Sequence, residues 1–90
     1  MGLTGRTTST ASPSLKSLVE ELTKSLVDRS DEVTVREIGG ANTLVYEVVV
    51  AKSDIGKIIG RNGRTLSALR TLVSAVATKL GRKAILEIVE

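Results

Sequence analysis

Two glycines separated by two polar residues form the part of this sequence best suited to bind an anion. The segment Gly60-Arg61-Asn62-Gly63 follows an apolar run that ends at Ile59, and a helical apolar pattern resumes at Leu66. Glycine permits unusual backbone angles and the close approach of another backbone. A narrow turn at the start of a helix, with the positive charges of Arg61 and Arg64 beside it, suits phosphate oxygens. The spacing therefore predicts a phosphate-binding loop.

The positive charge of the chain is concentrated around this turn. The net charge of the 90 residues is only +3, but eight basic residues and one acid, Asp54, lie between Ala51 and Lys83. The segments before and after carry more acids than bases. Such a distribution favours a polyanionic partner. A solvated helix face could also account for a run of charge, and the two glycines with their arginines favour the partner.

Several classes of function lack the residues they need. The chain contains no cysteine and no histidine, which removes disulfides, thiolate metal sites and the commonest general base. Gly60 and Gly63 do not form a P-loop, because no Gly-Lys-Ser or Gly-Lys-Thr follows them. We therefore expect no enzyme activity, no metal and no cofactor. Tyr46 is the only aromatic residue, which excludes an aromatic platform for base stacking.

The first residues differ in composition from the rest of the chain. Residues 1–13 are mostly Gly, Thr and Ser, and we predict a flexible tail there, followed by a single domain over 14–90. This start contains no apolar stretch of a secretory signal, and no segment of the chain is apolar enough to span a membrane. We therefore expect a cytoplasmic protein.

The first predicted element is an amphipathic helix. It should begin with Ser12 as N-cap and Pro13 as the first helical residue, and it should end near Arg29. Its apolar stripe is Leu15, Leu18, Val19, Leu22, Leu26 and Val27. Two strands, Val33–Ile38 and Thr43–Val50, follow on either side of a short turn, so they should pair as an antiparallel hairpin.

The second of these strands has two different faces. The face that we assign to the core carries Leu44, Tyr46, Val48 and Val50. The other face carries Val45, Glu47 and Val49, and the glutamate indicates that it meets water. Together with Ile85 of the last strand, the two valines leave an apolar patch. Strand propensity and a partner surface explain this patch equally well.

The loop lies between two more helices. Ser53 and Asp54 offer capping side chains for a short helix through Ile59, and a longer helix follows the loop and ends at Gly81. A last strand covers Ala84–Val89. The order α-β-β-α-α-β, with a right-handed crossover between the last two strands, predicts an α+β fold: a three-stranded mixed sheet with the helices packed on one face.

The loop in this setting resembles that of a KH domain. The residues that carry the resemblance are Ile58-Ile59-Gly60-Arg61-Asn62-Gly63-Arg64-Thr65-Leu66. The element order is similar to that of the type II KH domain, and the length is similar to that of small bacterial RNA-binding proteins that consist of a single KH domain. The resemblance covers roughly Leu15 to the C-terminus.

The resemblance implies a role for each residue around the loop. Gly60, Arg61, Asn62 and Gly63 would hold the sugar-phosphate backbone of single-stranded RNA. Ile59 and Leu66 would line an apolar groove for about four nucleotides, with Lys57, Arg64 and Thr65 beside the backbone. It further implies a non-catalytic RNA chaperone or post-transcriptional regulator, acting as a homodimer or with a larger KH-containing partner. A grip on the backbone does not distinguish RNA from single-stranded DNA.

Some residues around and after the loop could instead have a purely structural role. Gly56 could serve close helix packing, and Ile59 and Leu66 could belong to the core. The remaining basic residues could supply a general electrostatic field and make no direct contact with a ligand: Arg70, Lys79, Arg82 and Lys83. For the chain as a whole, the alternative function is a protein-interaction or assembly module that uses the fold as a scaffold.

Overall fold

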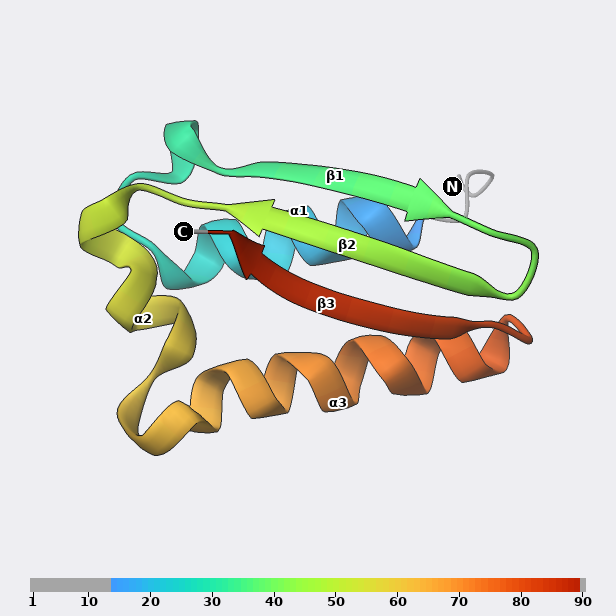
Figure 1. Cartoon of the computed structure of the whole chain (residues 1–90). Coiled ribbons are helices and arrows are strands. Elements are labelled where there is room, and N and C mark those ends of the chain that lie inside the picture. Colours follow the sequence, from blue (N-terminus) through green and yellow to red (C-terminus); the bar gives the residue numbers. More distant parts are fainter. Residues whose placement is uncertain (1–13, 90) are drawn as a thin grey trace, which may run out of the picture.

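The fold of the chain follows the predicted order of elements. The computed structural model describes residues 14–89, and the predicted tail at 1–13 lies outside them. In these residues the helices and strands follow one another as α1, β1, β2, α2, α3 and β3 (Figure 1). The predicted α+β class is confirmed, whereas the boundary between residues 13 and 14 stays a prediction. None of the helices over residues 14–89 is long and apolar enough to cross a membrane.

Helix α1 covers Leu15–Leu26, which is shorter than predicted at both ends. Ser14, not Ser12, is the N-cap, and its side chain accepts a hydrogen bond from the Ser17 amide at 3.1 Å. Ser14 has the same capping chemistry and directly precedes the first apolar residue. At the other end the backbone turns extended at Val27, so the predicted end near Arg29 was wrong.

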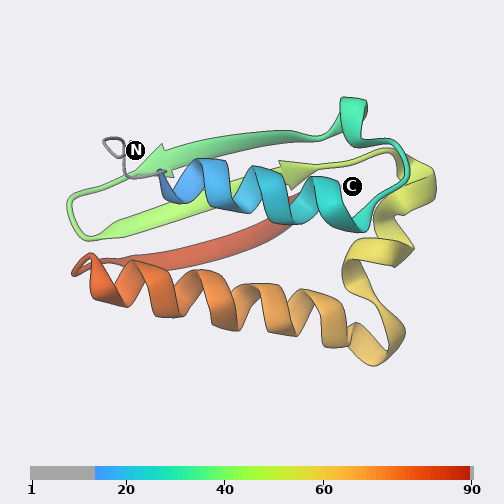
Figure 2. The same cartoon turned by 180° about the vertical axis from the view of Figure 1, so that it is seen from behind.

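The three strands form the mixed sheet that the sequence predicts. Strand β1 (Thr34–Gly39) pairs antiparallel with β2 (Thr43–Val49), and β2 pairs parallel with β3 (Lys83–Val89). Strand β2 is therefore central and β3 is an edge strand. Figures 1 and 2 show α1 and α3 side by side on one face of the sheet.

The core lies between this face and the helices. All four residues that we assigned to the core from the second strand are buried, and Tyr46 is completely so. The helices contribute further buried residues: Val19 from α1, Ile58 from α2, and Leu69, Val73 and Ala77 from α3. On the opposite face of the sheet, Ile38, Val49, Ile85 and Val89 are exposed. The predicted assignment of the two faces is thus confirmed.

Helix α3 (Arg64–Lys79) ends at the glycine that the sequence indicates. Gly81 has a φ of 74°, its amide donates to the Thr78 carbonyl, and the next amide, of Arg82, donates to the Ala77 carbonyl. This pair of bonds is the Schellman motif. The Lys83 amide then donates to the Asn42 carbonyl at 2.8 Å, so β3 starts directly beside β2.

Candidate nucleic-acid interface

The loop is carried by a very short helix. Helix α2 covers only Ile55–Ile59 and ends because Gly60 adopts a φ of 75° and a ψ of 176°. The Gly60 amide still donates to the Gly56 carbonyl at 2.8 Å, so the loop starts directly from the last turn of the helix. Ile58, which is completely buried, fixes this end of α2 in the core.

Gly60 is held close to the first turn of α3. A Cβ atom at this position would overlap Thr65 Oγ1 and would lie 2.7 Å from Thr65 Cβ and 2.9 Å from the Thr65 amide nitrogen. No side chain larger than hydrogen fits there unless Thr65 moves. Thr65 is half-buried, and it supports the loop from behind.

The second half of the loop turns through left-handed backbone angles. Asn62 has a φ of 57° and Gly63 a φ of 72°. Asparagine tolerates this region better than most residues, and glycine adopts it freely. A Cβ at Gly63 would meet nothing within 4 Å, so the backbone angle alone explains this glycine. Gly63 is also the N-cap of α3, and no side chain caps the helix start.

The loop therefore presents hydrogen-bond donors and positive charge together. The first amides of a helix have no partner within the helix, and the helix dipole adds partial positive charge. Arg61, Asn62 and Arg64 are exposed around this helix start. Within residues 14–89, neither arginine takes part in an ion pair. The arrangement can accept phosphate oxygens without first breaking one of the ion pairs described for residues 14–89.

Lys57, which we expected beside the RNA backbone, is bound to two carboxylates. Its ammonium nitrogen lies 2.7 Å from Asp28 Oδ2 and 3.5 Å from Asp54 Oδ1. The hydrogen bond to Asp28 and the charge of that residue raise the pKa of Lys57, and Asp54 raises it further. Asp28 precedes β1 in the chain, so no local pattern around Lys57 indicates this contact.

Asp54 stands at the N-cap position of α2, as the predicted helix start at Ser53-Asp54 requires, but no side chain forms a capping hydrogen bond there, so that part of the prediction was wrong. The Asp54 side chain is buried, and its Oδ2 accepts a hydrogen bond from the Arg29 amide at 2.9 Å. This bond is the main cause that lowers the pKa of Asp54, and the neighbouring positive charge of Lys57 contributes to the same shift. The carboxylate thus satisfies a backbone amide of the segment after α1 instead of its own helix.

The surface beside the loop is open and partly apolar. A Cβ at Gly56 would meet nothing within 4 Å, which contradicts the interpretation that this glycine serves helix packing. Ile59 is half-buried and lies one turn further along α2. Leu66 is also half-buried and packs against the core, so of the two predicted groove residues it is the more structural one.

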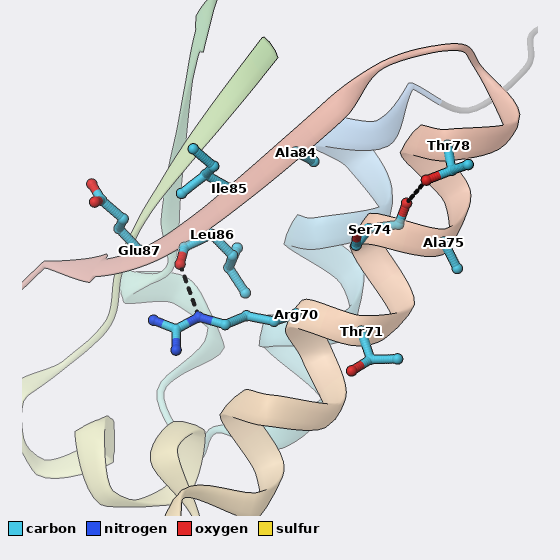
Figure 3. Close-up of a pocket in the computed structure, with 9 residues that line it drawn as sticks. All are labelled: Arg70, Thr71, Ser74, Ala75, Thr78, Ala84, Ile85, Leu86 and Glu87. Carbon is cyan, nitrogen blue, oxygen red and sulfur yellow. Dashed lines mark hydrogen bonds between the residues drawn. The ribbon is translucent and has the colours of Figure 1, made fainter.

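A groove between α3 and the free edge of β3 was missed by the sequence analysis. It has a volume of about 680 Å³ and is lined by Arg70, Thr71, Ser74, Ala75 and Thr78 of α3 and by residues 84–87 of β3 (Figure 3). The Arg70 Nε donates to the Leu86 carbonyl at 3.2 Å. The small residues at 71, 74, 75 and 78 share one side of the helix, and this spacing was the available signal.

Comparisons with known proteins agree with the fold. A family model described as "KhpA/KhpB, KH domain" matches residues 16–88. The relative from Chlamydia muridarum, RNA-binding protein KhpA, is 50% identical over 76 residues, which are 84% of this chain and 97% of that protein. The protein of the same name from Aquifex aeolicus is 46% identical over 76 residues, with 84% and 96% covered.

Two solved structures of Era are similar in fold. Era from Aquifex aeolicus bound to GDP·AlF4⁻ superposes with a TM-score of 0.58 at 23% identity, over 82% of this chain and 29% of that one. Era in complex with MgGDPNP and nucleotides of 16S ribosomal RNA superposes with a TM-score of 0.59, over 82% and 28%. The chain spans less than a third of Era, and the likeness concerns the fold alone.

Proposed function

Because the chain belongs to the KhpA/KhpB family of KH domains, we propose that it grips single-stranded RNA through the Gly60–Gly63 loop. The family is non-catalytic. RNA as the ligand is supported by the relatives named RNA-binding protein KhpA, which match this chain over almost their whole length. The observation that carries the proposal is the exposed turn itself, where a helix start without a side-chain cap lies beside two arginines that form no ion pair with the residues from 14 to 89.

In this proposal the sugar-phosphate backbone crosses the loop. Phosphate oxygens accept hydrogen bonds from the first amides of α3, and Arg61 and Arg64 neutralise their charge. The Asn62 side chain reaches the backbone from the tip of the loop. Thr65 contributes mainly by holding Gly60 in place, because the two residues are in contact.

The bases would lie beside the loop, along α2 and then the groove between α3 and β3. Gly56 leaves space, and Ile59 and Leu66 offer apolar surface. Further along, Arg70 and the main chain of the β3 edge offer hydrogen-bonding groups (Figure 3). A binding surface of this kind needs no aromatic side chain, which agrees with the complete burial of Tyr46.

The cellular role that we propose is that of an RNA chaperone or post-transcriptional regulator in the bacterial cytoplasm. One module of this size gives modest, salt-sensitive affinity, because much of its binding energy comes from phosphate contacts. Two sites linked in one assembly bind more tightly through effective concentration. We therefore propose a homodimer, or a heterodimer with a larger KhpB/Jag-type KH protein, as the active form.

The outer face of the sheet supports a second candidate function, that of an assembly module. Ile38, Val45 and Ile85 stand in one register row across the three strands, and no helix of residues 14–89 covers them (Figure 1). Val49 and Val89 form a second apolar pair on neighbouring strands. Exposed apolar patches of this kind often mark protein contacts.

One binding experiment separates the two candidates. Fluorescence anisotropy of a short labelled single-stranded RNA would be measured at low and near-physiological salt, with single-stranded DNA of the same sequence as a second ligand. We expect the wild type to bind and the double variant Arg61→Asp/Asn62→Asp to lose most of its affinity. The slope of log affinity against log salt should also fall by about 0.7 for each phosphate that the variant no longer neutralises.

The matched control changes the same charge at a distant place. Lys16→Asp/Ser17→Asp alters the net charge by the same amount in the first turn of α1, where acidic residues suit the helix dipole. Circular dichroism would confirm that both variants fold. If wild type and loop variant bind RNA equally weakly, the loop is not the site, and the search moves to a protein partner on the outer sheet.

A further inference from the structure

Helix α2 cannot hold its own position. It has five residues, and helices of this length are not stable alone in water. Its place in the fold must therefore come from contacts with other elements. Ile58 provides one such contact near the C-terminal end, in the core. The N-terminal end lies at Asp54, whose contacts are polar.

Asp54 ties the start of α2 to the chain segment that follows α1. Its side chain is only 1% exposed, and a buried carboxylate is costly unless it is paired and hydrogen-bonded. The Arg29 amide, 25 positions earlier in the chain, donates to Oδ2, and Lys57 stands beside Oδ1. This hydrogen bond gives the buried carboxylate a donor, and it gives an acceptor to a backbone amide that lies beyond the end of α1.

Lys57 provides a second contact between α2 and the segment that follows α1. Its ammonium bonds to Asp28, the neighbour of Arg29, at 2.7 Å, while Asp54 lies within 3.5 Å. The one cation thus joins carboxylates from both segments. We call these four groups the α2 latch: the side chains of Asp28, Asp54 and Lys57 and the amide of Arg29.

The loop follows directly after the latch residues in the chain. Lys57 precedes Gly60 by less than one helical turn, and the last hydrogen bond of α2 already involves the Gly60 amide. A tilt of α2 therefore moves Gly60, which lies against Thr65 in the first turn of α3. The Lys57 side chain is still 46% exposed, but its ammonium already lies 2.7 Å from Asp28 Oδ2 and 3.5 Å from Asp54 Oδ1, so a phosphate would have to compete with two carboxylates for it.

We propose that the α2 latch positions the RNA-binding loop, and that Lys57 acts through Asp54 and Asp28 rather than by contact with RNA. This inference rests on the proposed function of the loop. Lys57 is in this view a positioning residue, and the phosphates are held by the loop and by Arg61 and Arg64. The residue types alone would assign Lys57 to the phosphates, so the two roles make opposite predictions.

The salt dependence of RNA binding distinguishes the roles. We expect Lys57→Met to weaken binding by about tenfold while the slope of log affinity against log salt stays that of the wild type. A lysine that contacts phosphate would instead reduce the slope by about 0.7. Lys52→Met is the matched control, because Lys52 is exposed on the same segment and forms no ion pair within residues 14–89.

Asp28→Asn gives an independent result, because it releases one partner of Lys57 without changing the lysine. The latch predicts RNA binding no stronger than that of the wild type. If this variant binds more tightly and with a steeper salt slope, the freed lysine reaches phosphate, and the proposal is overturned.

The third readout does not depend on RNA. Asp54→Asn keeps an oxygen that can accept the Arg29 amide but loses the charge that holds Lys57. In ¹H–¹⁵N spectra of the free protein we expect shifts of the Gly60, Arg61 and Gly63 amides in both Asp54→Asn and Lys57→Met, and none in Lys52→Met. Unmoved loop amides would overturn the latch, whereas a wild type that fails to bind RNA would overturn the proposed function instead.

Discussion

The two glycines of the loop are required for different physical reasons. Gly60 combines a φ of 75° with a ψ of 176°, a region almost exclusive to glycine, and it also lies against Thr65. Gly63 has a left-handed φ of 72°, but its surroundings are open. The first position is restricted by backbone angle and by space, and the second by backbone angle alone.

Alanine substitutions should therefore have unequal effects. We expect Gly63→Ala to lower the free energy of unfolding by about 1 kcal/mol, the cost of a left-handed alanine. Gly60→Ala should cost clearly more, because the added methyl group also displaces Thr65. Urea unfolding of both variants measures the difference. Equal losses would show that Thr65 moves aside freely, and the close approach would then not explain Gly60.

At the residue scale, the sequence predicted the features that depend on neighbouring residues, such as the glycine turn. It missed the contacts that depend on residues far away in the chain. Gly60, Arg61, Asn62 and Gly63 stand in the exposed turn that their types and spacing predicted. Lys57 and Asp54 contact each other three positions apart, but their other partners, Asp28 and the Arg29 amide, lie 29 and 25 positions away, and no local pattern reveals them. The RNA contacts of all these residues stay predictions.

At the scale of elements, one side of α3 faces the core and another side lines the groove beside β3. Its buried apolar residues, Leu69, Val73 and Ala77, pack into the core. Its small residues leave the groove beside β3, where Arg70 lies over the Leu86 carbonyl (Figure 3). The proposed function assigns this groove to bases and the loop to phosphates, so the two can be perturbed separately.

Filling the groove should weaken RNA binding without removing the grip on phosphate. Ala75→Leu adds a large side chain to the groove at an exposed helix position. We expect lower affinity with an unchanged salt slope, because no charge is altered. Ala68→Leu makes the same change two turns earlier on α3, at an exposed position that lines a different pocket, together with residues of α1, and not the groove. If both variants bind like the wild type, the bases lie elsewhere.

The order and type of the elements were predictable because hydrophobic periodicity and glycine positions are local signals. The alternation in β2 and the glycine at the end of α3 each identified a structural feature correctly. The boundaries were less predictable. Helix α1 stops at Leu26 although Val27 continues the apolar pattern, and the extended chain that follows brings the Arg29 amide to Asp54, a distant contact that no local pattern reveals.

At the scale of the whole molecule, the latch also links stability to pH. The pKa of Asp54 lies below its ordinary value in the folded protein, so ionised Asp54 stabilises the fold at pH above the ordinary value of about 4. This contribution is lost as the pH falls through the lowered pKa. Acidification should therefore destabilise the wild type partly through this one group.

The comparison with Asp54→Asn isolates that contribution. We expect the variant to be less stable than the wild type at about pH 7, and the difference in free energy of unfolding to shrink below about pH 4. Urea unfolding at several pH values measures it. A difference that stays constant across this range would mean that the charge of Asp54 does not contribute to stability.

The parallel pairing of β2 with β3 affects the order in which the parts of the proposed binding surface form during synthesis and folding. Thr43 pairs with Lys83, and α2, the loop and α3 all lie in the chain between them. Contacts between residues so far apart in the sequence form slowly, because a long loop of chain must first close. During synthesis the glycine loop leaves the ribosome before the strand that forms the other wall of the groove. If the proposed function holds, a growing chain would thus offer positive charge and the apolar surface of α2 to RNA before the groove beside β3 exists, and any base selectivity that this groove confers would be acquired only when β3 docks.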